Sequence, residues 1–379
     1  MKVSILVGGK FHSVDLGLQL KKRGHLSQFI TTRAEVKSYL GGVVTAIPYP
    51  EYVGWAWRRL PWLNNRIHFS LLKDNLFDVL AARYLKPCDV LVAWSHFALF
   101  TMRRAKQRGV KVVLERGSAH ILTHRDLLVD EYSRLGLSYK VHPLPTLVIR
   151  KQLLEYDEAD IIMVPSHFVY ESFITHGVDS RKLRVIPYGI DATLFVPPRE
   201  PREEAKFRIL FVGSIELTKG VQYLLQAVKE LQLRNSEVIL IGQPDFAGRI
   251  LLKEYQDLCH HIPHVPHQGL VQYYQAASVL VLPSLSEGQA MVTSEAMACG
   301  LPVIVSSNTG ALARDGVDGF IVPPGDVWAL KEKLVYMYEH RQEAQEMGNN
   351  ARKYVSENYT WDHYGEKVIG VYREMLGFN

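Results

Sequence analysis

Short apolar runs of strand length alternate with amphipathic helical stretches along most of this chain. The first unit runs from VSILVG through a helix at about residues 14–23 to LSQFITT. CDVLVAW and VKVVLERG flank a second helix, and EADIIMVPS and KLRVIPYG flank a third. Such alternation predicts a parallel sheet with helices on both of its faces.

A proline-rich, charged stretch at residues 197–206, PPREPREEAK, reads as an interdomain linker. A second alternation follows it, with strands at FRILFVGS, SEVILIG, SVLVLPS and PVIVSS. A chain of 379 residues suits two domains. We therefore expect an α/β protein with two Rossmann-like, doubly wound parallel-sheet domains, at 1–196 and 207–356. The two face each other across a cleft, where the carboxyl ends of the strands bind ligands.

Charge and cysteine content limit the possible binding partners and the cellular compartment of this protein. Residues 1–180 hold 24 Lys and Arg against 16 Asp and Glu, whereas the remainder holds 20 against 23. A basic first half indicates an anionic partner, which composition leaves open among a membrane surface, a phosphorylated substrate and nucleic acid. Three scattered cysteines and no run of eighteen apolar residues predict a cytoplasmic protein without a spanning helix.

The stretch SEGQAMVTSEAMACGLPV places two carboxylates, Glu287 and Glu295, eight residues apart. It follows the strand SVLVLPS, so we expect a loop at 284–290 and a helix that begins near Val292. Small residues there let a ligand approach the backbone, and the free amides of a helix start favour a diphosphate. The two carboxylates suit sugar hydroxyls. Alternatively, Glu287 caps the helix and Glu295 faces solvent.

Two further strands end in turns led by glycine. FVGSIELTKG places Gly213 in the turn and Lys219 where a cation can meet a phosphate, although Lys219 taken alone reads as a surface lysine. The first strand ends in Gly8-Gly9-Lys10. Neither a Walker A loop nor a G-x-G-x-x-G motif is present, which disfavours P-loop and dinucleotide enzymes.

Three other segments carry histidine or tryptophan. VVLERGSAHILTH places Arg116, His120 and His124 just beyond a strand end, where a histidine is either structural or catalytic. The histidines of 260–267 have no partner cluster elsewhere, so we expect no metal site. The segment GWAWRRLPWLNNR reads either as an interfacial membrane anchor or as part of the core of the first domain. The anchor would comprise Trp55, Trp57, Arg58, Arg59 and Trp62.

Taken together, these motifs resemble the family 4 retaining glycosyltransferases of the GT-B fold. EGQAMVTSEAMACGLPV resembles the family signature E-G-F-G-x-x-x-x-E-A-M-A-x-G-x-P-V, and FVGSIELTKG resembles F-V-G-R-L-x-x-x-K-G. RVIPYGIDATLF, HQGLVQYYQAASVLVLPSLSEG and DGVDGFIVPPGD follow the family pattern in order and spacing. The resemblance covers nearly the whole chain and is strongest from Val185 onward.

The resemblance implies a UDP- or GDP-linked sugar donor held mainly by the second domain, with no cofactor and no metal. It implies that Glu295 binds the ribose hydroxyls and Glu287 those of the donor sugar, that Lys219 neutralises the diphosphate, and that His120 lies over the sugar. The expected donor-binding residues are Gly8, Gly9, Lys10, Gly213, Ser214, Lys219, Glu287, Gly288, Gln289, Ala290, Met291, Val292 and Glu295, with His120, Lys219 and Glu287 as the catalytic candidates.

The family resemblance also implies an acceptor-binding first domain and a last helix, at 357–379, that crosses back to it. We expect a glycan or lipid-linked acceptor in cell-envelope synthesis, peripheral contact with the inner face of the membrane, and no nucleic-acid partner. The chain departs from the family at Ser214, which replaces an arginine, at Gln289-Ala290, and at Thr309-Gly310, where a glutamate is missing. These departures leave a second reading, a catalytically impaired sugar-nucleotide-binding or scaffold protein.

Overall fold

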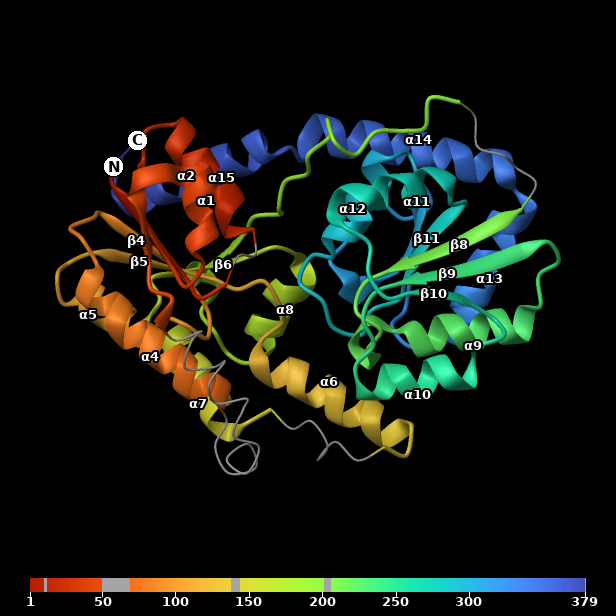
Figure 1. Cartoon of the computed structure of the whole chain (residues 1–379), viewed down its shortest axis with the longest axis horizontal. Coiled ribbons are helices and arrows are strands. Elements are labelled where there is room, and N and C mark those ends of the chain that lie inside the picture. Colours follow the sequence, from red (N-terminus) through yellow and green to blue (C-terminus); the bar gives the residue numbers. More distant parts are fainter. Residues whose placement is uncertain (10–11, 50–68, 138–143, 201–205, 379) are drawn as a thin grey trace.

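Two parallel sheets, each covered by helices, lie side by side in the molecule (Figure 1). The computed structural model describes residues 1–9, 12–49, 69–137, 144–200 and 206–378. Every strand pair within the two sheets is parallel. The predicted fold class, two doubly wound α/β domains, is therefore confirmed. Of the expected linker, the structure describes only residues 197–200 and Lys206.

The first sheet follows the order β3-β2-β1-β4-β5-β6-β7. Its strands are β1 (Val3–Val7), β2 (Leu26–Thr31), β3 (Val44–Ala46), β4 (Val90–Trp94), β5 (Lys111–Glu115), β6 (Ile161–Val164) and β7 (Leu183–Val185). In the central strands β1 and β4 every residue is buried. Because helices cover both faces, such strands read as continuous apolar runs in the sequence.

The helices of the first domain include several that the strand-based prediction did not place. They are α1 (Ser13–Lys22), α2 (Lys37–Leu40), α4 (Phe69–Tyr84), α5 (Leu99–Lys106), α6 (Ile121–Arg134), α7 (Thr146–Glu158) and α8 (His167–Thr175). Of these, α2, α4, α6 and α7 were not expected from the sequence. Helix α6 begins at Ile121 and lies between the two domains (Figure 1), and its residue His124 contacts Ser286 of the second domain.

The second sheet follows the order β10-β9-β8-β11-β12-β13. Its strands are β8 (Phe207–Val212), β9 (Ser236–Ile241), β10 (His260–Ile262), β11 (Val279–Leu282), β12 (Val303–Ser306) and β13 (Gly319–Val322). The helices around it are α9 (Val221–Leu231), α10 (Phe246–Glu254), α11 (Leu270–Ala276), α12 (Met291–Ala298), α13 (Val327–Glu339) and α14 (Arg341–Asn358). The central strand β8 lies between β9 and β11, so the loops after β8 and β11 are neighbours at one edge of the sheet.

The last helix, α15 (Trp361–Met375), packs on the first domain beside α1 (Figure 1). Tyr364, Val368 and Tyr372 are buried in the same hydrophobic cluster as residues of β1 and β4. Thr360 caps the helix by accepting from the backbone N–H of His363. The two domains are thus joined twice, by the linker and by α15.

The backbone requires a glycine at position 220, where the loop after β8 enters α9. Gly220 has a φ of +70°, and a Cβ there would collide with the main-chain oxygen of Pro283. Gly220→Ala should therefore cost more than about 2 kcal/mol in the free energy of unfolding. Gly109→Ala is the matched control, because Gly109 has a φ of +73° and nothing within 4 Å of its Cβ position. Equal losses for both variants in urea unfolding would contradict the collision.

Candidate active site between the domains

The loop after β11 packs directly on the first domain. A side chain on Gly288 would collide with the main-chain oxygen of Gly117, which follows β5. Ser166 Oγ donates to the main-chain oxygen of Gly288 at 2.6 Å. Strand ends of both sheets therefore meet at this point, as the sequence predicted for a cleft between two doubly wound domains.

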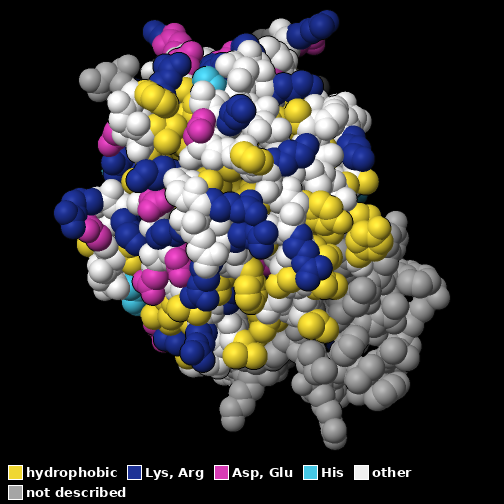
Figure 2. All heavy atoms as spheres, turned by 90° about the vertical axis from the view of Figure 1, so that its left-hand side faces the viewer, with side chains coloured by type: hydrophobic (Ala, Val, Ile, Leu, Met, Phe, Trp, Pro, Cys, Tyr) yellow, Lys and Arg dark blue, Asp and Glu magenta, His cyan; other side chains and the backbone are white. Residues whose placement is uncertain are grey.

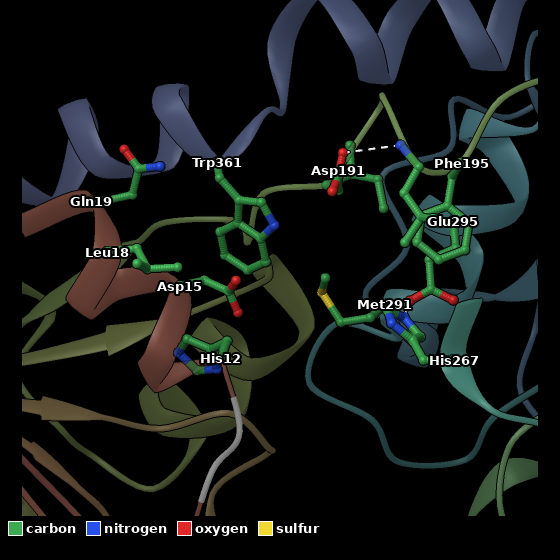
Figure 3. A pocket seen from close by; sticks show the side chains of 12 residues that line it. His12, Asp15, Leu18, Gln19, Asp191, Phe195, His267, Met291, Glu295 and Trp361 are labelled. Carbon is green, nitrogen blue, oxygen red and sulfur yellow. Dashed lines mark hydrogen bonds and ion pairs between the residues drawn. The ribbon is translucent and has the colours of Figure 1, made fainter. Parts of the chain in front are cut away.

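A cavity of about 550 Å³ lies between the domains beside this contact (Figure 3). Figure 3 shows His12, Asp15 and Trp361 on one side and Glu295, His267 and Met291 on the other. The remaining lining residues are Leu18, Gln19, Ile190, Asp191, Leu194 and Phe195. The first domain, α15 and the second domain all contribute to this cavity, so it depends on their relative placement.

Glu295 is the buried acid of this cavity, with 3% of its surface exposed. Its Oε2 accepts from the hydroxyl of Tyr274 at 2.8 Å, and its Oε1 lies 2.8 Å from His267 Nε2. Burial, and then the charge of Glu295, raise the pKa of Tyr274 well above its usual range, so its phenol donates. Glu295 therefore does not face solvent. Its carboxylate lies in the cavity wall, where it can accept hydrogen bonds from a ligand.

Helix α12 begins at the same cavity, one turn before Glu295. Its N-cap is Ala290, which has no side-chain acceptor for the first amides. The N–H of Ala290 donates to Thr309 O at 3.2 Å. Met291, the first residue of the helix, lines the cavity. The start of α12 thus presents the positive end of a helix dipole to the space between the domains, where an anion is stabilised.

Gln289, one of the expected donor-binding residues, bridges the two domains. Its side-chain oxygen accepts from the N–H of Tyr188 at 2.7 Å, and its amide nitrogen lies 3.4 Å from Tyr188 O. The side chain is 4% exposed. In this structure Gln289 therefore fixes the loop after β11 against the residues that follow β7.

Lys219 and Glu287 form an ion pair. Lys219 ends a 3-10 helix, η6 (Leu217–Lys219), after β8, and Glu287 lies in the loop after β11. The two side chains are about one-fifth exposed, at 20% and 18%. Burial lowers the pKa of Lys219, an effect that Glu216 opposes. The structure thus brings together a cation and a carboxylate that the sequence placed 68 positions apart. Neither lines the cavity of Figure 3.

The glycine-led turns lie at the strand ends where the sequence placed them. A Cβ on Gly8 would collide with the ring of Phe97, and Gly8 O accepts from Thr32 Oγ1 at 2.7 Å. Gly213 has a φ of +153°, a value that L side chains rarely adopt. Ser214 is exposed beside it, where the family has an arginine. Lys10 lies outside the described residues.

His120 is buried inside the first domain. It is the N-cap of α6, where its Nδ1 accepts from the N–H of Leu122 at 3.3 Å, and it is 2% exposed. Its ring stacks on that of His176 with centroids 4.2 Å apart. His120 does not line the cavity of Figure 3. The histidine that reaches the loop after β11 is His124, whose Nδ1 lies 3.0 Å from Ser286 Oγ.

Burial of His120 predicts a pH dependence of stability. Burial, and then His176 and Arg116, lower the pKa of its imidazole from 6.5 to about 3. As the pH falls, the imidazole of His120 therefore becomes protonated in the unfolded chain before it does so in the folded protein. The contribution of neutral His120 to the free energy of unfolding is complete above about pH 6.5 and is lost progressively as the pH falls towards 3. His120→Asn, which keeps an N-cap oxygen, should flatten the change in urea midpoint between about pH 7 and 5.

Exposed His264 provides the control, since His264→Asn should leave that pH dependence unchanged. A variant His120→Asn with the same pH dependence as the wild type would contradict the assignment.

Three residues at a second cavity were not singled out from the sequence. His12, Glu115 and Tyr188 line a space of about 480 Å³ on the first-domain side. His12 precedes α1, Glu115 ends β5 and Tyr188 follows β7. Met291 lines this cavity as well as the first. The sequence offered one indication of a shared site for these residues: each of the three lies at or just beyond the end of a strand.

Other sequence predictions concern metal and membrane. Within the described residues, no group of three or more His, Cys, Asp or Glu side chains could hold a metal ion. The histidines of 260–267 do not share a common partner: His261 contacts Gly242 O, whereas His267 contacts Glu295. No helix in the described part of the chain is long and apolar enough to cross a membrane. The candidate anchor, Trp55 to Trp62, lies outside the described residues.

Comparison with family sequence profiles covers most of the chain in two consecutive matches. Residues 8–194 match the profile of Glycosyltransferase Family 4, and residues 195–354 match that of Glycosyl transferases group 1. An uncharacterized glycosyltransferase of Methanocaldococcus jannaschii is 29% identical over 98% of this chain and 96% of its own length.

Other curated relatives match over about half of their length. The MMP alpha-(1->4)-mannosyltransferase of Mycolicibacterium hassiacum is 30% identical over 57% of this chain and 54% of its own. The D-inositol 3-phosphate glycosyltransferase of Paenarthrobacter aurescens is 30% identical over 54% of this chain and 55% of its own.

Solved structures share the fold at low sequence identity. A sucrose-phosphate synthase from Thermosynechococcus elongatus superposes with a TM-score of 0.70 at 20% identity, over 100% of this chain and 99% of that one. The Anabaena protein HepE in complex with UDP-glucose gives a TM-score of 0.69 at 16% identity, over 98% of this chain and 99% of that one.

Proposed function

This chain belongs to glycosyltransferase family 4, and from that membership we propose that it moves a sugar from a nucleoside-diphosphate donor to a glycan or lipid-linked acceptor. The donor in this proposal is UDP- or GDP-linked, as in the UDP and UDP-glucose complexes of HepE. The acceptor belongs to cell-envelope polysaccharide or glycolipid synthesis, and the anomeric configuration of the sugar is retained.

The observation that carries the proposal is the buried carboxylate of Glu295 in the cavity between the domains. A ribose presents two adjacent hydroxyls, and a carboxylate with two oxygens is a suitable acceptor for both. His267 and Tyr274 contact the two oxygens of Glu295 in the structure. His267 has a side chain that is 63% exposed, so a nucleoside can take its place at Oε1.

The reacting part of the donor lies, in our proposal, between the start of α12 and the Lys219–Glu287 pair. The helix start and Lys219 stabilise the charge of the diphosphate as it leaves, and Glu287 accepts from hydroxyls of the sugar. The leaving phosphate oxygen takes the proton of the acceptor hydroxyl on the same face of the sugar, which retains configuration. The positive charge comes from the protein, so the proposal requires no metal.

We further propose peripheral contact with an anionic membrane through the first domain. Helix α5 packs against both α4 and α7, and these helices expose Leu72, Phe100 and Leu147. Arg103, Arg104 and Arg150 are exposed on α5 and α7. Figure 2 shows basic and hydrophobic side chains interspersed on this side of the domain. Such a surface binds acidic lipid. Sedimentation with acidic but not with neutral vesicles is the expected result, and equal recovery would contradict it.

The second candidate is a catalytically impaired sugar-nucleotide-binding protein. Exposed Ser214 in place of an arginine removes one cation from the diphosphate, and the loop at Thr309-Gly310 lacks a glutamate. The retention of Glu287, Glu295 and Lys219 favours the enzyme.

Hydrolysis of a panel of nucleotide sugars without acceptor separates the two candidates. The transferase should release nucleoside diphosphate slowly from one donor, and proton NMR of the first sugar released should show the retained anomer. Binding of a donor without any turnover, under reducing conditions with lipid present, would favour the impaired protein.

A further inference from the structure

The second cavity, of about 480 Å³, has aromatic walls and belongs almost entirely to the first domain. Trp94, Phe97 and Tyr188 form the apolar walls. The remaining lining residues are His12, Ser95, Glu115, Arg116, Gly117, Ser118 and Met291, of which Met291 alone comes from the second domain. Pockets that combine aromatic walls with a few polar groups are typical ligand sites.

The polar groups of this cavity retain unused hydrogen-bonding capacity. Glu115 is 2% exposed, and one of its oxygens accepts from the hydroxyl of Tyr364 at 3.4 Å. His12 Nε2 lies 3.5 Å from the other oxygen and has no hydrogen-bond partner among the described residues. The hydroxyl of Tyr188, which is 6% exposed, also lacks a partner within the described chain. Buried polar atoms are rarely left unpaired, so these atoms indicate a ligand.

Glycine at 117 leaves space beside the buried hydroxyl of Tyr188. A Cβ at this position would come within 2.9 Å of that hydroxyl. Burial, and then the charge of Glu115, raise the pKa of Tyr188 well above its usual range, so the phenol remains a donor. The cavity therefore offers a carboxylate acceptor and a phenol donor beside flat aromatic surfaces.

We propose that this cavity binds an uncharged sugar ring of the acceptor, with Glu115 and Tyr188 on its hydroxyls and the aromatic side chains against its C–H face. The assignment to the acceptor rests on the proposed function, in which the nucleotide occupies the other cavity and the start of α12. Met291 lines both cavities, so a hydroxyl of the bound ring can approach the donor diphosphate at that residue.

The charge of Glu115 selects against an anionic ring. Arg116, the adjacent cation in the cavity lining, is already paired: it donates to Ala119 O and to Gln152 Oε1, both at 2.7 Å, and at longer distance to Ser118 O and Ser95 Oγ. Among the described residues, His12 is the other potential cation that faces Glu115. A phosphate or carboxylate on the ligand would thus lie near a buried negative charge without a free basic partner among the described lining residues, which is unfavourable.

Two pairs of ligands that differ only in charge test this selection. Methyl α-D-glucopyranoside is compared with its glucuronide, and myo-inositol with D-inositol 3-phosphate, by saturation-transfer NMR on the full chain without donor. Each neutral probe should bind at least about tenfold more tightly than its charged counterpart. Glu115→Gln, which removes the charge at constant shape, should reduce that preference to about threefold or less. Tyr188→Phe should weaken the neutral probes severalfold.

Glu171→Gln is the matched control, because Glu171 is an exposed glutamate of α8, and it should keep the wild-type preference. Charged probes that bind as well as neutral ones, neutral probes that do not bind, or a preference that survives in folded Glu115→Gln would each overturn the inference. Because binding is measured without donor, these results are independent of donor hydrolysis, whose absence would instead count against the proposed function.

Discussion

Replacing Glu295 by alanine should weaken binding of the cognate nucleotide sugar by about 100-fold. Two hydrogen bonds from ribose hydroxyls to a buried carboxylate, each worth about 1.5 to 3 kcal/mol, together contribute about 3 to 6 kcal/mol, so about 100-fold is the lower end of the expected loss. Glu295 is 3% exposed and lines the cavity between the domains. Calorimetric titration with the nucleoside diphosphate measures the loss.

Two variants separate this role from a structural one. Glu295→Ala also removes the acceptor of the Tyr274 hydroxyl, so its melting temperature is measured beside its affinity. His267→Ala removes the other contact of Glu295 without touching the carboxylate, and it should leave the affinity equal or higher. An unchanged dissociation constant in folded Glu295→Ala would refute the placement of the ribose.

Replacing Lys219 by alanine should lower kcat by about 100-fold to 1000-fold. The loss of one preorganised positive charge at a leaving group costs about 3 to 4 kcal/mol in the transition state. The variant also leaves Glu287 without its ion-pair partner, which places an uncompensated carboxylate beside the diphosphate. Initial rates at saturating donor measure this effect apart from binding.

Lys253→Ala is the matched control, since Lys253 is an exposed lysine on α10 in the same domain. It should retain the wild-type rate, whereas Lys219→Arg should recover part of the lost activity because it keeps the charge. A folded Lys219→Ala enzyme with wild-type kcat would contradict the role of this residue at the leaving group.

The fold class could be predicted because short segments of the sequence determine its strands and helices. Strands buried on both faces, such as β4, leave continuous apolar runs, and the alternation with helices fixes a parallel sheet. Lys219 and Glu287 could be identified for a related reason. Each follows a strand of the second sheet, and β8 and β11 are neighbours, so the loops that follow them meet.

The direction of individual side chains could not be predicted in this way. His120 and His124 lie four residues apart, yet His120 caps α6 inside the first domain whereas His124 reaches Ser286 of the other domain. Gln289, expected at the donor, is held by the main chain of Tyr188. These outcomes depend on how the two domains pack, which no local pattern encodes.

The second cavity was missed for the same physical reason. His12, Glu115 and Tyr188 are separated by more than seventy positions at each step, and strands β1, β5 and β7 are not adjacent in the sheet. Their side chains line one cavity because the segments that follow these parallel strands lie at the same edge of the sheet. Glu115 also occupies the last position of an apolar strand, where a sequence pattern gives it no special role.

The most direct test of a nucleotide-sugar site between the domains is thermal unfolding with a panel of UDP-, GDP- and ADP-sugars. At about 100 times its dissociation constant, a cognate donor adds about 2.7 kcal/mol, so one donor should raise the melting temperature of the wild type by several degrees. The same donor should leave Glu295→Ala almost unchanged. If no nucleotide sugar raises the melting temperature, or if Glu295→Ala responds as the wild type does, the site is not the one described.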